Sequence, residues 1–138
     1  MSKNRKFLLT SSILGALSII LGAFGAHALK ARLDPDQLLV FETGVRYQMY
    51  HALVLLGLAV LSEKLSSKYI NYAFWCFVIG TIFFSGSIYL LSTRSILGLQ
   101  GFTKILGPIT PLGGLLLIIG WILIFISALT SKEISKNL

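Results

Sequence analysis

Four long, mostly apolar stretches separated by short polar connections dominate the pattern of this chain. They cover residues 7–29, 47–65, 69–93 and 105–131. An α-helix rises about 1.5 Å per residue, so about 20 apolar residues cross the roughly 30 Å hydrocarbon core of a bilayer. The second stretch is the shortest, and we expect Arg46 and Lys64 to extend it by reaching toward the headgroups. The pattern predicts an all-α integral membrane protein with four transmembrane helices.

A short interfacial helix is expected between the first and second spans, over residues 35–43. Asp34 is suited to cap its amino end, and Pro35 fits the first helical position, where a backbone N–H is not needed. On this helix Phe41 is expected to face lipid, and Gly44 is a candidate for a bend into the second span.

Composition supports the same class of protein and limits its partners. Of the 138 residues 55% are hydrophobic and only 12% are charged, with a mean hydropathy of +0.83. No tract is polar enough to form a separate soluble domain, so residues 1–138 are expected to form a single transmembrane domain. The net charge of +7 comes from short clusters without interleaved aromatic residues, which favours membrane lipids as partners and argues against nucleic acid.

The distribution of Lys and Arg predicts that both termini are cytoplasmic in the plasma (inner) membrane. Seven of these residues fall on the side of the termini, namely Lys3, Arg5, Lys6, Lys64, Lys68, Lys132 and Lys136. Five fall on the other side, namely Lys30, Arg32, Arg46, Arg94 and Lys104. Cytoplasmic connections carry the excess of positive charge, and the cluster before the first span usually dominates.

A cleavable signal sequence is the alternative interpretation of the first span. Ala26, His27 and Ala28 have the small-polar-small pattern of a cleavage site. The uncharged run before them is much longer than the roughly 7 to 15 residues typical of a signal peptide. An uncleaved transmembrane helix is therefore preferred.

Small residues form a stripe along the first span, at Ser11, Gly15, Ser18, Gly22 and Ala26. Their spacing of three or four residues places them on one helical face. Small side chains let helix backbones approach closely in lipid. We expect packing within the chain, with a homodimer contact as the alternative.

A polar cluster is predicted where the first span ends and the second begins. Its members are His27, Glu42, Arg46, Tyr47, Gln48 and His51. In a four-span arrangement they converge at the outer membrane face, together with Arg94 and Lys104. Polar groups inside a membrane are costly, so they suggest a functional site by default. A structural role is nevertheless favoured here, with Glu42 paired to Arg46 and His51 bonded to a carbonyl.

The fourth span opens with a helix-start motif composed of Gly107, Pro108, Thr110, Pro111, Gly113 and Gly114. Thr110 is suited to cap a helix and Pro111 to its first position, whereas Pro108 resists backward extension of the helix. We therefore expect a broken or kinked start. Its free N–H groups would point toward an anion such as a lipid headgroup.

Three segments together resemble a known family. They are Gly22 to Leu29, Phe41 to Leu53 and Gly107 to Gly114. The chain resembles, over nearly its whole length, the YgdD-type family of small bacterial inner-membrane proteins, which has eukaryotic relatives and is a domain of unknown function. The resemblance implies a membrane location and transfers no catalytic residue.

The function predicted from these observations is that of a non-enzymatic binding or accessory protein with a polar cluster at the outer face. No cofactor is predicted, and a homo-oligomer or a membrane-protein partner is left open. Three alternatives remain. His27 and His51, with Glu42 as a third ligand, would bind haem or a metal; Ser85 with His51 as base would make a hydrolase; and an oligomer would transport a small solute or lipid.

Overall fold

The computed structural model describes residues 2–62, 64–65 and 67–131, and every regular element in them is helical. In chain order the elements are helix α1 (Lys3–Phe24), π-helical turn η1 (Gly25–Leu29), helices α2 (Pro35–Leu61), α3 (Ser67–Ser92) and α4 (Arg94–Leu97), 3-10 turn η2 (Gln100–Phe102) and helix α5 (Thr103–Thr130). Four helical stretches are long and apolar enough to cross a membrane, which confirms the predicted fold class. Lys132 and Lys136 lie outside the described residues.

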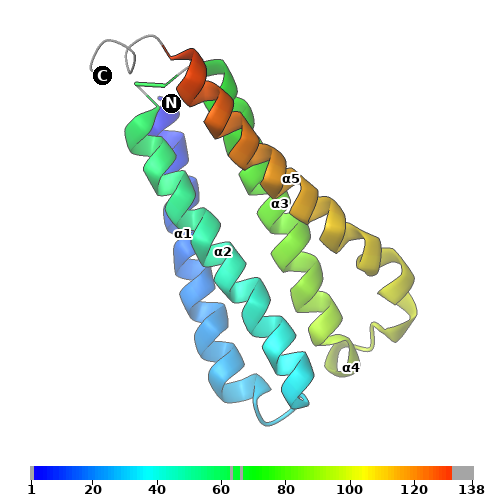
Figure 1. The fold of residues 1–138 in the computed structure, drawn as a ribbon. Helices are drawn as coiled ribbons and strands as arrows, with labels where there is room; N and C mark the ends of the chain where they lie inside the picture. The colour runs from blue at the N-terminus through cyan, green and yellow to red at the C-terminus, as the bar shows by residue number, and fades with distance from the viewer. Residues whose placement is uncertain (1, 63, 66, 132–138) are drawn as a thin grey trace.

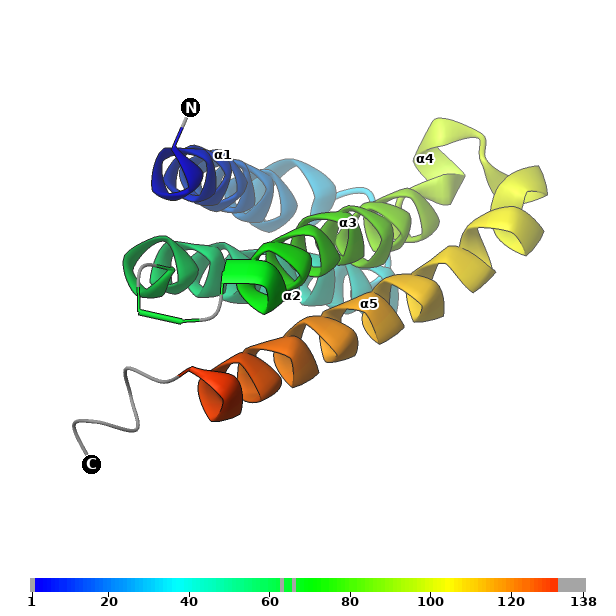
Figure 2. The same cartoon turned by 90° about the horizontal axis from the view of Figure 1, so that it is seen from above.

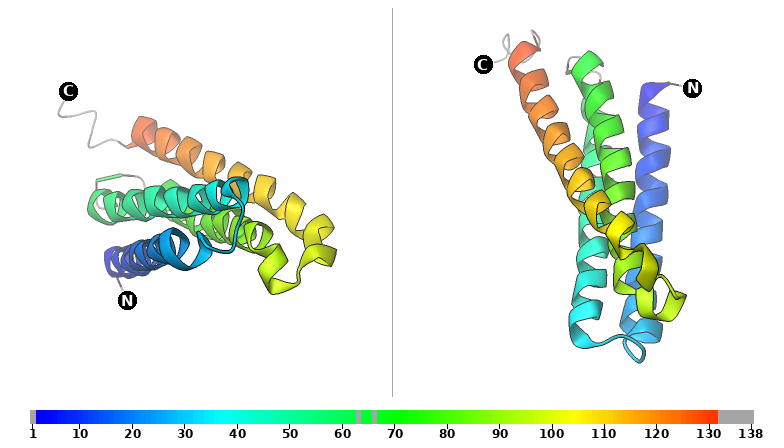
Figure 3. Two further views of the ribbon diagram at one scale, coloured as in Figure 1. Left: turned by 90° about the horizontal axis from the view of Figure 1, so that it is seen from below. Right: turned by 90° about the vertical axis from the view of Figure 1, so that its right-hand side faces the viewer.

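The long helices alternate in direction and pack mainly in sequence order, α1 on α2, α2 on α3 and α3 on α5 (Figures 1 and 2). The start of α1 and the end of α5 lie at the same end of the molecule, which we call the terminal end (Figure 1). The opposite end holds η1, the start of α2, α4 and η2, and we call it the distal end (Figure 3). Helices suit lipid because they satisfy their backbone hydrogen bonds internally.

Helix α2 is continuous from Pro35, so residues 35–43 are its first turns rather than a separate interfacial helix. The expected cap is present, because the Asp34 carboxylate accepts a hydrogen bond of 2.8 Å from the Gln37 N–H. No break occurs at Gly44, which instead lets α3 approach closely. A Cβ atom at Gly44 would lie 2.8 Å from the Tyr89 ring.

The first turns of α2 are also held by packing. Phe41 is only 3% exposed and forms a small core with Leu29 and Leu33. The expectation that Phe41 faces lipid was therefore wrong. An interfacial helix would have kept this ring on the membrane surface, whereas the continuous helix turns it inward against the end of α1.

Helix α5 begins at Thr103 and contains both Pro108 and Pro111, so the expected break at its start is absent. Thr110 does not cap the helix, because its hydroxyl lies 2.7 Å from the Ser87 hydroxyl on α3. A proline inside a helix removes the hydrogen bond to the carbonyl four residues earlier. Those carbonyls belong to Lys104 and Gly107 near the distal end, where water and headgroups offer partners.

One glycine of the same motif allows α3 and α5 to approach closely. A Cβ atom at Gly113 would lie 2.3 Å from the Phe84 nitrogen and 2.9 Å from the Gly80 carbonyl oxygen. At the neighbouring Gly114 the nearest atom would be 3.6 Å away, an ordinary contact. The motif therefore acts in helix packing, as small residues do at membrane helix interfaces.

The small-residue stripe of α1 packs within the chain, as expected. The Ser11 hydroxyl donates to the Ala52 carbonyl at 2.8 Å, and the Ser18 hydroxyl donates to the Val45 carbonyl at 2.9 Å. The two glycines of the stripe face the same two α2 residues. The last member, Ala26, is exposed.

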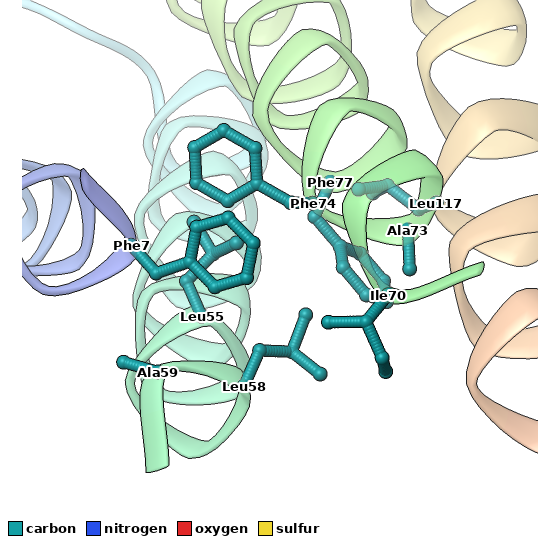
Figure 4. Packing of buried hydrophobic residues seen from close by; sticks show 9 residues of the cluster. All are labelled: Phe7, Leu55, Leu58, Ala59, Ile70, Ala73, Phe74, Phe77 and Leu117. Atoms are coloured by element: carbon teal, nitrogen blue, oxygen red, sulfur yellow. The ribbon is translucent and has the colours of Figure 1, made fainter. Parts of the chain in front are cut away.

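An apolar core joins all four long helices, mostly toward the terminal end (Figure 4). Its buried members are Phe7, Leu55, Leu58, Ala59, Ile70, Ala73, Phe74, Phe77 and Leu117. The rings of Phe7 and Phe74 stack with their centroids 4.2 Å apart. This core leaves the middle and distal parts of the bundle to polar contacts and to a cavity.

Candidate functional site

The predicted polar cluster does not gather at one membrane face. Glu42, Arg46 and Tyr47 are exposed, whereas Gln48 and His51 are each only 5% exposed. Because α2 is continuous from Pro35, His51 lies sixteen residues along it, roughly 24 Å from its start. These side chains are therefore spread from the distal end to the middle of the bundle.

Glu42 and Arg46 are not paired. The Arg46 guanidinium donates to the Thr43 hydroxyl at 3.3 Å instead. A carboxylate and a guanidinium four residues apart on a helix contribute little when both are in water. Among the described residues, Arg46 has no carboxylate within ion-pair distance.

Gln48 ties three helices together in the middle of the bundle. Its amide nitrogen donates to the Leu14 carbonyl on α1 at 2.9 Å, and its amide oxygen accepts from the Tyr89 hydroxyl on α3 at 2.8 Å. One turn away, the Ser85 hydroxyl donates to the Gly44 carbonyl at 2.8 Å. The sequence did not reveal the hydrogen bond of Tyr89 to Gln48, because a tyrosine in an apolar run can equally face lipid.

His51 makes the carbonyl contact that was expected of it. Its Nδ1 atom lies 2.8 Å from the Tyr47 carbonyl oxygen, and since that oxygen only accepts, Nδ1 carries the hydrogen. The ring packs against Phe77 with the centroids 5.4 Å apart. A neutral imidazole with one nitrogen bonded in this way suits a buried site.

The structure does not bring the two histidines together. Gly22 of α1 lies beside Val45 of α2. From this level the exposed His27 lies five residues toward the distal end, and His51 lies six residues toward the terminal end. The two histidines are therefore separated along the bundle by the rise of eleven helical residues, roughly 16 Å. Within the described ranges, no group of three or more His, Cys, Asp or Glu residues is arranged to hold a metal ion.

Ser85 and His51 are also separated. The Ser85 hydroxyl bonds at the level of Gly44, seven residues from His51 and therefore roughly 10 Å along α2. A nucleophile and its base must lie about 3 Å apart. The arrangement does not support the hydrolase alternative.

A cavity of about 340 Å³ opens at the distal end, between η1, the start of α2 and the end of α3 with α4. Its lining consists of Leu21, Phe24, Ala28, Leu29, Arg32, Phe41, Tyr89, Leu90, Thr93, Ile96 and Leu97. The volume falls at the lower end of the range of small-molecule sites, which are typically apolar with a few placed polar groups. This lining follows the same pattern.

Local backbone features shape the walls of this cavity. Gly25 opens the π-helical turn, and a Cβ atom there would lie 3.1 Å from the Phe41 ring. The rings of Phe41 and Tyr89 are in contact, with centroids 5.0 Å apart. Helix α4, which brings Leu97 to the cavity, ends at Gly98 with φ of +67°, a conformation that favours glycine. Isolated π-helical turns frequently occur at functional sites.

Together these features define a small multi-pass membrane protein built from four helices, with an apolar cavity at one end. Residues 21–114 match the family model described as "Protein of unknown function (DUF423)". The chain therefore belongs to the DUF423 family, also called UPF0382, and the predicted resemblance is confirmed.

Relatives of this family occur in several bacteria. The chain is 44% identical over 123 residues to the UPF0382 membrane protein YwdK of Bacillus subtilis, which covers 88% of this chain and 94% of the relative. It is 41% identical over 121 residues to a UPF0382 membrane protein of Staphylococcus epidermidis, and the match covers 85% of this chain and 93% of the relative. It is 35% identical over 130 residues to the inner membrane protein YgdD of Escherichia coli K12, covering 94% of both chains. The chain is thus a multi-pass inner-membrane protein.

No solved structure matches the chain.

Proposed function

We propose that this protein is a non-enzymatic binding protein that takes the hydrocarbon chain of a membrane amphiphile into the distal cavity. The observation that carries the proposal is the cavity itself, about 340 Å³ in volume and lined mainly by Leu, Phe, Ile and Ala side chains. Lining residues such as Phe24 and Leu97 are also exposed, so the cavity opens at the surface of the bundle. A space of this size beside the lipid-facing surface is suited to an acyl chain.

The cavity walls are held in place before a ligand binds. Tyr89 contacts Phe41 through its ring and donates its hydroxyl to Gln48, which in turn bonds to α1. A preformed wall reduces the ordering cost of binding. This supports a binding role with one defined occupant rather than occasional filling by lipid.

Several observations favour binding over catalysis. Among the described residues that line the cavity, none is Ser, Cys, Asp, Glu or His. The Ser85 hydroxyl and His51 Nδ1 are both engaged with backbone carbonyls. A catalytic site usually combines a nucleophile or base with a group that stabilises developing charge.

The proposed setting is a membrane in which both termini face the cytoplasm and the distal end faces outward. The Lys3, Arg5 and Lys6 cluster before the first span supports this orientation. Membrane lipids are the proposed partners. An accessory role in which the protein presents its bound amphiphile to another membrane protein fits the small size of the bundle.

Photo-crosslinking tests the proposal. A long-chain alcohol carrying a diazirine near its tail is added to membranes containing the full chain, and labelled peptides are mapped by mass spectrometry. Labelling is expected on η1 and on the end of α3, which border the cavity.

Two matched variants, in each of which one alanine is replaced by phenylalanine, give the control. Ala28 lines the cavity and Ala23 does not, and both are exposed residues five positions apart near the end of the first span. Ala28→Phe fills the cavity and is expected to abolish the specific label, whereas Ala23→Phe is expected to keep it. Equal labelling of both variants, spread over all lipid-facing helices, would overturn the proposal.

A further inference from the structure

We infer that the amphiphile is a single-chain acid whose carboxylate is bound by Arg32 at the mouth of the cavity. This inference rests on the proposed function and adds the chemical class of the ligand. Among the lining residues that the structure describes, Arg32 is the only charged one. It lies in the connection after η1, where its backbone N–H donates to the Leu29 carbonyl at 2.9 Å.

The side chain of Arg32 has donors to offer. Within the described part of the chain it has no hydrogen-bond or ion-pair partner, and it is exposed. Arg46 donates to Thr43, and Arg94 donates to the Leu91 carbonyl at 2.6 Å. A guanidinium presents a planar set of N–H donors that matches a carboxylate in a bidentate pair.

The other polar side chains of the lining are already engaged. The Tyr89 hydroxyl donates to Gln48 at 2.8 Å, and the Thr93 hydroxyl donates to the Tyr89 carbonyl at 2.7 Å. A ligand headgroup therefore meets one polar partner, the positive charge of Arg32. This complementarity selects an anion over a neutral or cationic headgroup.

The position of Arg32 also fits the shape of such a ligand. Arg32 precedes the start of α2 at the distal end, where a charged headgroup stays in the interface. Leu21 lines the inner part of the cavity, eight residues before Leu29, and so lies roughly 12 Å deeper along α1. A chain that runs from the interface inward, with its acid group at the mouth, satisfies both ends.

The limited volume indicates one chain rather than two. At about 340 Å³ the cavity is near the lower limit of small-molecule sites. A diacyl phospholipid would leave its second chain outside, where it gains nothing from the cavity. A single-chain acid of the fatty-acid type is therefore the occupant that we propose.

The test compares two ligands that differ only in the headgroup. Radiolabelled dodecanoic acid and dodecanol are titrated onto the full chain in phosphatidylcholine nanodiscs at low salt, and binding to empty nanodiscs is subtracted. The wild-type protein is expected to bind the acid about tenfold more tightly than the alcohol, as for a charge-assisted hydrogen bond. Arg32→Gln is expected to bring the ratio close to one.

Lys30→Gln is the matched control, because Lys30 is an exposed cation two residues away and is not among the lining residues. It is expected to keep the tenfold ratio. Equal binding of acid and alcohol by the wild type overturns this inference alone, whereas binding of neither ligand overturns the proposed function as well. In a competition experiment, phosphatidylglycerol in the nanodisc and unlabelled dodecanoic acid are each used to displace the radiolabelled acid. If phosphatidylglycerol displaces it more effectively, a diacyl lipid is the occupant and the inference is overturned.

Discussion

Replacing Gly113 with alanine is expected to separate α3 from α5. The new Cβ atom would lie 2.3 Å from the Phe84 nitrogen, 2.8 Å from the Phe84 Cα and 2.9 Å from the Gly80 oxygen. All three are backbone atoms, so no side-chain rotation relieves the contact. The two helices must move apart by about 1 Å, which removes packing along their shared face.

The magnitude follows from two opposing effects. Overpacking a well-packed contact costs about 1 to 3 kcal/mol, and the backbone clash at Gly113 places this variant at the upper end. Alanine in a helix gains about 1 kcal/mol over glycine. The expected net loss in the free energy of unfolding is therefore about 2 kcal/mol.

Gly114→Ala provides the control in the adjacent position. Its Cβ atom would meet the Phe84 ring no closer than 3.6 Å, so only the gain in helix propensity remains, up to about 1 kcal/mol. Both variants are unfolded by SDS titration in mixed micelles and followed by far-UV circular dichroism. If Gly113→Ala proves as stable as Gly114→Ala, the close approach of α3 and α5 is not real.

Three further predictions concern side chains and topology. Thr81 is 2% exposed, and its hydroxyl has no partner within the described residues. Thr81→Val is therefore expected to raise the free energy of unfolding by about 1 to 3 kcal/mol in the same titration. Ser85→Ala, which removes a hydrogen bond to a carbonyl, is expected to lower that free energy. Glu42→Gln and Arg46→Gln are each expected to leave that free energy within about 0.5 kcal/mol of the parent, and a measurable coupling between them in a double-mutant cycle would mean that they are partners after all. Reporter fusions at the carboxyl terminus and in the connection before α2 are expected to report cytoplasm and exterior respectively, and the reverse pattern would contradict the proposed orientation.

Local signals in the sequence predicted the parts of the fold that depend on local contacts. Asp34 and Pro35 were identified as the start of a helix because capping involves only the next few residues. The length and apolar character of the four stretches sufficed to predict the spans. The effects of Gly44 and Pro108 were misjudged because Gly44 and Thr110 contact α3, and contacts between helices leave no local signal in the sequence.

The candidate site was harder to predict for a related reason. The polar residues Gln48 and His51 were selected because they stand out in an apolar run, yet both are engaged in bonds that hold the bundle together. The cavity is lined mostly by side chains that look the same as lipid-facing ones. Only Arg32 stands out among them, and in the sequence it was one of several cations used to assign topology.

The polar contacts and the cavity are nevertheless parts of one arrangement, and Tyr89 connects them. Its ring forms the cavity wall with Phe41, while its hydroxyl bonds to Gln48 and so to the Leu14 carbonyl on α1. Without that bond the half-buried Tyr89 hydroxyl would lose its partner on α2, and a typical hydrogen bond contributes about 0.5 to 1.5 kcal/mol. The bond therefore fixes the position of the ring, and with it the width of the space between α1 and α3. Gln48, which does not itself line the cavity, thus helps to set the shape of this apolar site through Tyr89.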